Sequence, residues 1–151
     1  MPEATIKFNL RSDSQQVLDE LYQRILNALQ EACDEETARW GKDTITVTHK
    51  RYCNVPAGTQ DIHAPIVEAT YAIIQHLGYD PEFNHGGSTN CNMAIGKNVP
   101  GVCLGMGGVD CGAHTLQEFF ETEEAYKGVQ QAMLLALMLA GVEGQTESIL
   151  D

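Results

Sequence analysis

The last predicted helix limits the possible folds more than any other part of the sequence. It runs from Thr122 to about Ala140, and its second half, the run AMLLALMLA, is apolar nearly all round. Such a helix must be covered on most of its sides, because apolar surface left in water lowers stability. The segment that contains it is therefore expected to be part of a layered α/β domain, although too few strands are visible to complete one.

The first part of the chain alternates between strand and helix patterns. The segments ATIKFNLRS and DTITVTHKRY alternate apolar and polar residues, which is typical of half-buried strands. Between them, apolar residues recur at helical spacing from Val17 to Ala32, with Ser12 and Asp13 as N-cap candidates and Gly41 beyond the end. Residues 1–52 are predicted to form a strand-helix-strand unit.

A turn-rich segment separates this unit from the rest of the chain. The residues CNVPAGTQD show no apolar periodicity, so the boundary is placed there, between domains 1–52 and 53–151. Beyond it, Pro65 at a helix N-terminus and Gly78 at its end bracket a second amphipathic helix. The run VPGVCLGM is then predicted to be a short strand, and Glu123 and Glu124 are expected in the first turn of the last helix.

Composition excludes several classes of function. A net charge of -12, with no cluster of Lys and Arg, disfavours nucleic acid and anionic membranes as partners. No apolar run reaches the roughly 20 residues of a membrane span, and the N-terminus does not resemble a signal peptide, so a cytoplasmic location is expected. The five cysteines lack CxxC spacing and are expected to be buried free thiols.

The stretch from His85 to Phe120 concentrates glycines around a few polar side chains. GGST and GMGG could present backbone N–H groups to an anion, but neither matches a Walker or Rossmann pattern. His114 follows the apolar run in a glycine-rich loop, with Glu118 four residues later, and this placement suits a metal ligand at the mouth of a parallel sheet. A lone histidine is more often structural, and zinc needs three or four ligands, so His114 alone holds no metal.

Three motifs in fixed order resemble a known family. GGSTNCN, GKNVPGVCLG and GGVDCGAHTLQE are similar to the closing segment of the dinuclear-zinc amidohydrolases that include aminoacylase, acetylornithine deacetylase, succinyl-diaminopimelate desuccinylase and peptidase T. FNLRSDS and the helix after it resemble the lid or dimerisation domain of that family, and VPAG resembles its return to the catalytic domain. The resemblance covers nearly the whole chain.

The resemblance implies a fold, a reaction and a set of site residues. The fold would be part of a zinc-peptidase-like α/β/α catalytic domain, preceded by the end of an α+β lid that forms a homodimer. The whole enzyme would use two zinc ions, with cobalt or manganese as alternatives, to cleave small peptides or N-acyl amino acids. By position, His114 would be a metal ligand, and the residues that would bind substrate are Asn9, Arg11, Gly87, Ser88 and Thr89.

The chain also departs from the family pattern. Asn90 and Cys91 stand where the family has aspartate and a smaller residue, and the upstream H-x-D motif, bridging aspartate and Glu-Glu pair are not found. The pairs Glu35–Glu36 and Glu123–Glu124 are interpreted as solvated helix charges. His85 borders the substrate loop, whereas structural or surface roles are expected for His49, His63 and His76.

Three functional hypotheses follow. The chain is expected to be a fragment of such a hydrolase, produced by deliberate truncation, by proteolysis or from a truncated gene, with no catalytic residue and no activity of its own. The alternative is a non-catalytic dimerisation module derived from that family. A third hypothesis is complementation by a separately encoded N-terminal half.

Overall fold

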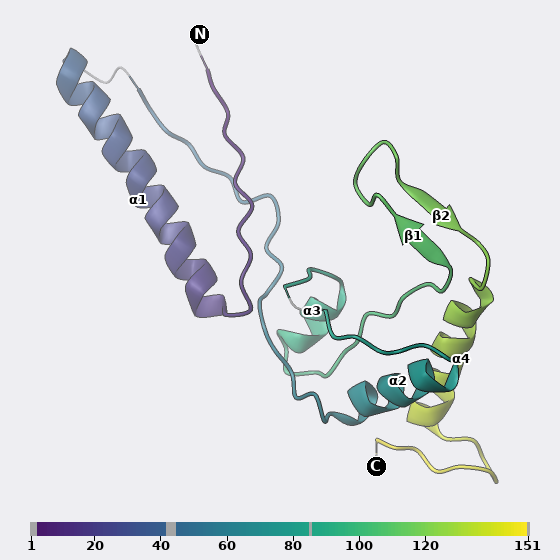
Figure 1. The fold of residues 1–151 in the computed structure, drawn as a ribbon. Coiled ribbons are helices and arrows are strands. Elements are labelled where there is room, and N and C mark those ends of the chain that lie inside the picture. Colours follow the sequence, from purple (N-terminus) through teal and green to yellow (C-terminus); the bar gives the residue numbers. More distant parts are fainter. Residues whose placement is uncertain (1–2, 42–44, 85, 151) are drawn as a thin grey trace. The chain divides into compact units, whose positions relative to one another are not determined.

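The structure, a computed structural model, describes residues 3–41, 45–84 and 86–150. Within these residues the protein combines four helices with one two-stranded antiparallel sheet (Figure 1). The chain divides into two compact units, Met1–Thr59 and Gln60–Asp151, and the division falls inside the turn-rich segment after Tyr52. The protein is therefore a small mixed helix-and-sheet protein.

The first unit is built around α1, Gln15–Trp40. The helix begins one or two residues later than expected, because the hydroxyl of Ser14 accepts a hydrogen bond from the Val17 N–H at 3.4 Å and caps the first turn. It ends where predicted, since Gly41 adopts a φ of 61° and donates its N–H to the Thr37 carbonyl.

The two predicted strands of this unit are wrong. Residues 3–11 and 45–58 are extended, but the structure assigns no strand to them. Alternation sets which side chains share a face, whereas a strand also needs a neighbour for its backbone N–H and C=O groups. Their apolar side chains consequently stay exposed, at 68% for Ile6, 55% for Phe8 and 48% for Ile45.

Side chains hold the second extended segment to α1. The Tyr22 ring lies edge-on to His49 at 6.1 Å between centroids, and the guanidinium of Arg51 lies 4.7 Å from the same ring. Gln15 accepts the Ala57 N–H at 3.1 Å. This unit is thus a helix with extended chain attached to it, and Cys33 is its buried apolar residue among those described. The expectation of buried thiols is wrong for Cys53, Cys103 and Cys111, which are exposed.

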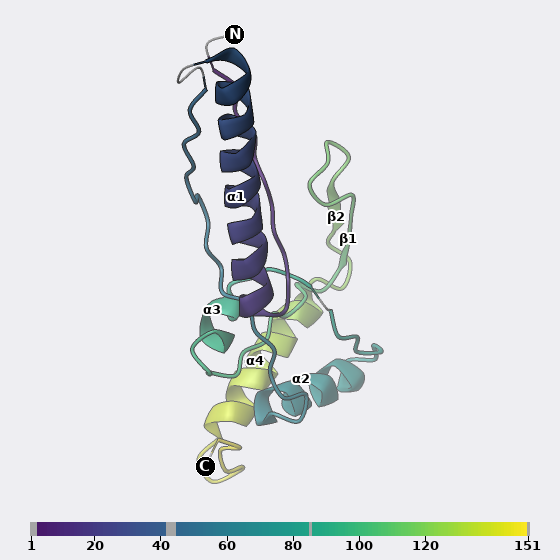
Figure 2. The same ribbon diagram turned by 90° about the vertical axis from the view of Figure 1, so that its left-hand side faces the viewer.

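The second unit has its core between two helices. In order it contains α2 (Pro65–His76), α3 (Cys91–Ile95), β1 (Val109–Cys111), β2 (Phe119–Glu121) and α4 (Tyr126–Ala140). Helix α2 packs against α4, as Figure 1 and Figure 2 show, and Ala69, Ile73 and Leu135 form the buried contact. Val102 and Leu104 pack onto this cluster from the run after α3.

The ends of α2 lie where the sequence predicts them, whereas the start of α4 does not. Pro65 begins α2 and Gly78, with a φ of 89°, follows its end, as predicted. Helix α4 begins at Tyr126, so the expectation that Glu123 and Glu124 lie in its first turn is wrong. Glu124 has a φ of 63°, a left-handed conformation that an α-helix does not accept.

The apolar run at 99–106 is extended without being a strand, which corrects the predicted strand there. A side chain takes the place of a neighbouring strand at its centre. The Gln60 amide donates to the Gly101 carbonyl and accepts the Gly101 N–H, the latter at 3.0 Å. Both backbone groups of Gly101 are therefore satisfied without a ladder.

The chain exposes more surface than folded domains of its size normally do. Its accessible area is 12186 Å². A single domain of this length would expose about 7,500 Å², and two separate domains of the observed sizes roughly 9,000 Å² together. Many large apolar side chains are exposed. None of the described helices is long and apolar enough to cross a membrane.

Candidate functional site

His114 lies in the loop that joins the two strands of the hairpin. Strands β1 and β2 pair antiparallel, with Val109 opposite Glu121 and Cys111 opposite Phe119 (Figure 1). His114 is exposed and has a φ of 67°, a conformation that a non-glycine residue rarely adopts. The expected place at the mouth of a parallel sheet is therefore wrong, because the strands flanking His114 run antiparallel.

Short-range hydrogen bonds fix the loop around His114. The His114 N–H donates to the Glu118 carboxylate at 3.2 Å. The Thr115 hydroxyl donates to the Gly112 carbonyl at 2.7 Å and accepts the Gln117 N–H at 3.2 Å. Thr115 and Glu118 thus hold the backbone while the imidazole faces solvent. The sequence pattern did not predict this loop-shaping role, although the HTLQE motif contains both residues.

The predicted substrate loop, Gly87 to Thr89, leads into α3. The Thr89 N–H donates to the side-chain carbonyl of Asn92 at 2.8 Å, and the Thr89 hydroxyl lies 2.8 Å from the thiol sulfur of Cys91. These contacts form a local turn that begins the five-residue helix. Gly87, Ser88 and Thr89 are exposed.

The predicted site residues fall into separate groups. Asn9 and Arg11 are exposed residues of the first unit, whereas the 87–89 loop and His114 belong to the second. Across the described part of the second unit, no hydrogen bond or ion pair joins the 87–89 loop to the His114 loop. His85 lies outside the described residues.

The described residues do not by themselves fit a pair of zinc ions. Among residues 3–41, 45–84 and 86–150, no group of three or more His, Cys, Asp or Glu side chains could hold a metal ion. The Glu118 carboxylate accepts the backbone N–H of His114. A zinc site that used His114 would need ligands from outside these residues.

A polar cluster joins the end of α2 to the start of α4. The Tyr79 hydroxyl donates to the Glu124 carboxylate, Lys127 pairs with the same carboxylate at 2.7 Å, and its ammonium lies 4.6 Å from the Tyr79 ring centroid. The hydrogen bond from Tyr79 to Glu124 raises the pKa of Tyr79 above 10.0. The bonds from Lys127 and Tyr79 lower the pKa of Glu124, and Glu124 raises the pKa of Lys127. This cluster holds Glu124 just before the first turn of α4.

These pKa shifts predict how the contribution of the cluster to the stability of the fold changes with pH. The lowered pKa of Glu124 contributes stability above about pH 4.5, which is lost as pH falls through the folded value. The raised pKa values of Tyr79 and Lys127 contribute stability below about pH 10, and this stability is lost as pH rises through the folded values.

Tyr79→Phe is thus expected to destabilise the protein at neutral pH. The difference in stability between wild type and variant should shrink at low pH and at high pH. Urea unfolding from pH 3 to about 11 measures it, and Tyr52→Phe, at a 78% exposed ring, is the control. A pH-independent difference would contradict the assignment.

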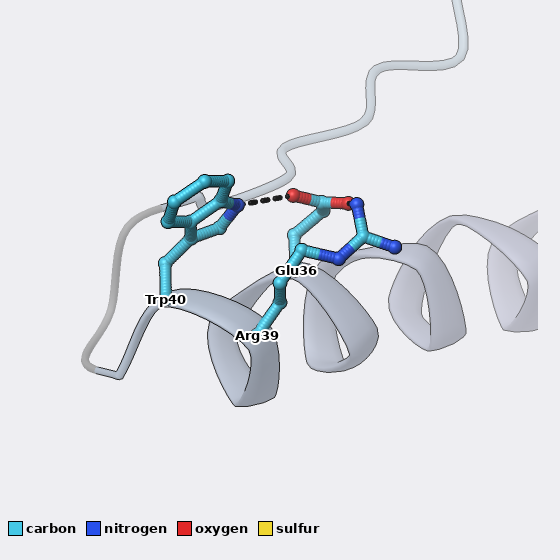
Figure 3. A network of polar contacts seen from close by, with 3 residues as sticks. All are labelled: Glu36, Arg39 and Trp40. Atoms are coloured by element: carbon cyan, nitrogen blue, oxygen red, sulfur yellow. Dashed lines mark hydrogen bonds and ion pairs between the residues drawn. The ribbon is translucent and has the colours of Figure 1, made fainter.

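Glu36, one half of an adjacent glutamate pair, has a structural role at the end of α1. Glu36 accepts a hydrogen bond from the Trp40 indole N–H at 2.9 Å and one from the Arg39 guanidinium at 2.7 Å. Figure 3 shows the three side chains together in the last turns of the helix. Both bonds join the carboxylate to residues of its own helix. Glu36 is therefore a helix surface residue.

No family model, curated protein or solved structure matches the chain.

Proposed function

We propose that this chain is the C-terminal part of a metal-dependent amidohydrolase or peptidase that cleaves amide bonds of N-acyl amino acids or small peptides. The support is the order and spacing of its motifs, GGSTNCN, GKNVPGVCLG and GGVDCGAHTLQE, which resemble the closing segment of the aminoacylase and peptidase T family. A zinc-peptidase-like α/β/α domain and a cytoplasmic location are part of the same proposal.

The His114 loop is the observation that carries the proposal furthest. Gly112, Thr115 and Glu118 use their polar groups to shape the backbone, and the imidazole is left exposed and free of a hydrogen bond or ion pair within the described residues. A metal-ligating histidine needs such an accessible ring nitrogen on a fixed backbone. A histidine that served only packing would be buried or paired.

Completion of the site is the second part of the proposal. The remaining metal ligands and the general base would come from polypeptide beyond the described residues, and the isolated chain would be inactive. Asn9, Arg11 and the 87–89 loop would contact substrate in the completed enzyme. The exposed area beyond that of a normal domain supports a further covering segment.

A non-catalytic dimerisation module is the second candidate, and one observation favours it. The extended segments 3–11 and 45–58 leave apolar side chains exposed and backbone groups without a ladder. Such edges pair readily with a second copy of the same edge. This function needs no metal and no substrate.

Zinc-supplemented hydrolysis of N-acetyl amino acids and dipeptides separates the two. The chain alone is expected to be inert, whereas a longer polypeptide with upstream H-x-D and Glu-Glu motifs is expected to bind two metals and turn over. In that polypeptide His114→Ala should reduce bound zinc and lower kcat/KM by at least about 100-fold, because loss of even an outer-shell partner of a metal ligand costs roughly 10- to 100-fold. His63→Ala is the matched control, because His63 is exposed and pairs with Glu68 at 3.0 Å.

Two results would contradict the proposal. Turnover by the isolated chain, checked by intact mass, would show that its own residues build a site. An unchanged metal content in His114→Ala, with the longer polypeptide active, would remove His114 from the ligands and leave the dimerisation module as the better function.

A further inference from the structure

Gln60 bonds both backbone groups of a residue 41 positions away in the sequence. Its side-chain amide donates to the Gly101 carbonyl, and its side-chain oxygen accepts the Gly101 N–H at 3.0 Å. Both bonds are part-buried, so water competes for these groups less than it does on an open surface. Gln60 therefore fixes the backbone at Gly101 from the side, as a neighbouring strand would.

The backbone next to Gln60 is tied to the start of α2. Asp61 accepts the His63 N–H through its side chain at 2.9 Å and the Ala64 N–H through its carbonyl at 3.1 Å. These bonds close the turn that leads into α2, and α2 packs on α4. Gln60 thus stands on a fixed base, which a side chain needs if it is to hold another segment in place.

The short helix α3 lies against Gly101. A methyl group placed on Gly101 would lie 3.4 Å from the Cβ of Ala94 and 3.6 Å from the Cβ of Cys91. The turn between α3 and Gly101 is closed by the Val99 N–H, which donates to the Ala94 carbonyl at 3.0 Å. In the described part of the second unit, no other helix or strand packs on α3. Because a five-residue helix is not stable alone, the run at Gly101 sets where α3 lies.

The 87–89 loop ends in the first turn of α3. The Thr89 carbonyl accepts the Asn92 N–H at 3.2 Å, and the Thr89 N–H donates to the Asn92 side chain at 2.8 Å. Thr89 must therefore move when α3 moves. A continuous set of contacts leads from the start of α2 through Gln60, Gly101 and α3 to this loop.

We propose that Gln60 is a positioning residue, which holds the 87–89 loop in place through Gly101 and α3. That the loop binds substrate rests on the proposed function, whereas the way in which the loop is held rests on the contacts of this chain alone. Gln60 would act without touching substrate, because its amide is already used by Gly101.

Amide hydrogen exchange on this chain tests how the loop is held. Gln60→Ala is expected to lower the protection of the Thr89 and Val99 N–H groups at least about tenfold, because both bonds to Gly101 are lost. Protection within α2 and α4 should change little, since their shared core is untouched. Gln75→Ala is the matched control, because Gln75 is exposed on α2. Unchanged protection at Thr89, or an equal loss in α2 and α4, would overturn the proposal.

Gln60→Glu adds a test that depends on pH. An ionised carboxylate accepts the Gly101 N–H but cannot donate to the Gly101 carbonyl, whereas a protonated carboxyl group does both, as the amide does. Relative to wild type at the same pH, protection of Thr89 should be low near neutral pH and recover at about pH 4. Gln75→Glu should show no recovery. A loss in Gln60→Glu that persists at low pH would overturn the proposal, also where Gln60→Ala does not fold.

Kinetics of the longer polypeptide separate this inference from the proposed function. There, Gln60→Ala is expected to raise KM about tenfold and to change kcat less, because the loop that would bind substrate is displaced. Selective loss of protection with an unchanged KM would remove Gln60 from the substrate-positioning residues and overturn the proposal. Absence of turnover would contradict the proposed function only, because hydrogen exchange decides how the loop is held without any substrate.

Discussion

Replacement of Ile73 by alanine is expected to lower the free energy of unfolding of the second unit by about 3–4 kcal/mol. Ile73 is 3% exposed and lies with Ala69 and Leu135 in the contact between α2 and α4. The loss combines the transfer free energy of the removed methyl groups with the cavity they leave. Because buried apolar residues are few among those described, this cost is a large share of the total stability.

Urea unfolding followed by circular dichroism measures the change. Gln75→Ala is the matched control, because Gln75 lies two residues away on the exposed side of α2 and its replacement should change stability by less than about 0.5 kcal/mol. Similar losses in both variants would mean that α2 is not held by its contact with α4.

Gly128→Ala is expected to destabilise the second unit by about 2–3 kcal/mol, although alanine is the better helix former. In an exposed helix the same change would stabilise by about 1 kcal/mol. Here a methyl group at Gly128 would overlap the backbone of Met106 and lie 2.7 Å from the Gly107 nitrogen. Backbone atoms cannot rotate away as a flexible side chain can, so the overlap forces α4 away from the backbone of Met106 and Gly107.

Gly105→Ala provides the control, because a methyl group there meets nothing within 4 Å and the residue does not need a left-handed φ. Thermal unfolding of the two variants should differ by several degrees. A stabilised Gly128→Ala would show that α4 does not pack against the backbone of Met106 and Gly107.

The helices could be read from the sequence because their signals are local. The apolar spacing of a helix, a proline at its start such as Pro65 and a glycine after its end such as Gly41 are signals that span about four residues or fewer. Helices α1 and α2 lie close to where these signals predict them. The start of α4 was misplaced because Glu124 binds Tyr79, a residue 45 positions away, and no local pattern contains that contact.

The strands could not be predicted in the same way. The alternation at 3–11 and 45–52 is real, but a strand depends on a partner whose identity the alternation does not contain. The same holds for the run at 99–106, whose pattern does not contain its bonding partner. The Gln60 side chain bonds the backbone of Gly101 there, in place of a neighbouring strand. The observed sheet, β1 with β2, comes from a stretch that the sequence suggested only as glycine-rich loop.

The candidate site was predictable as motifs and not as geometry. The exposed His114 and the turn at Thr89 lie in the motifs that suggested them. Their distance from Asn9 and Arg11 depends on contacts between elements far apart in sequence, which motif spacing does not encode. Whether they form one site stays a prediction.

The bonds that shape the His114 loop connect residues only two to four positions apart. Because these bonds are so local, closing the loop loses little chain entropy, and the loop should form quickly. The backbone that presents His114 is therefore expected to be in place early in folding, before long-range contacts such as Tyr79–Glu124 form. Any further ligands would then assemble around a histidine that is already held in position.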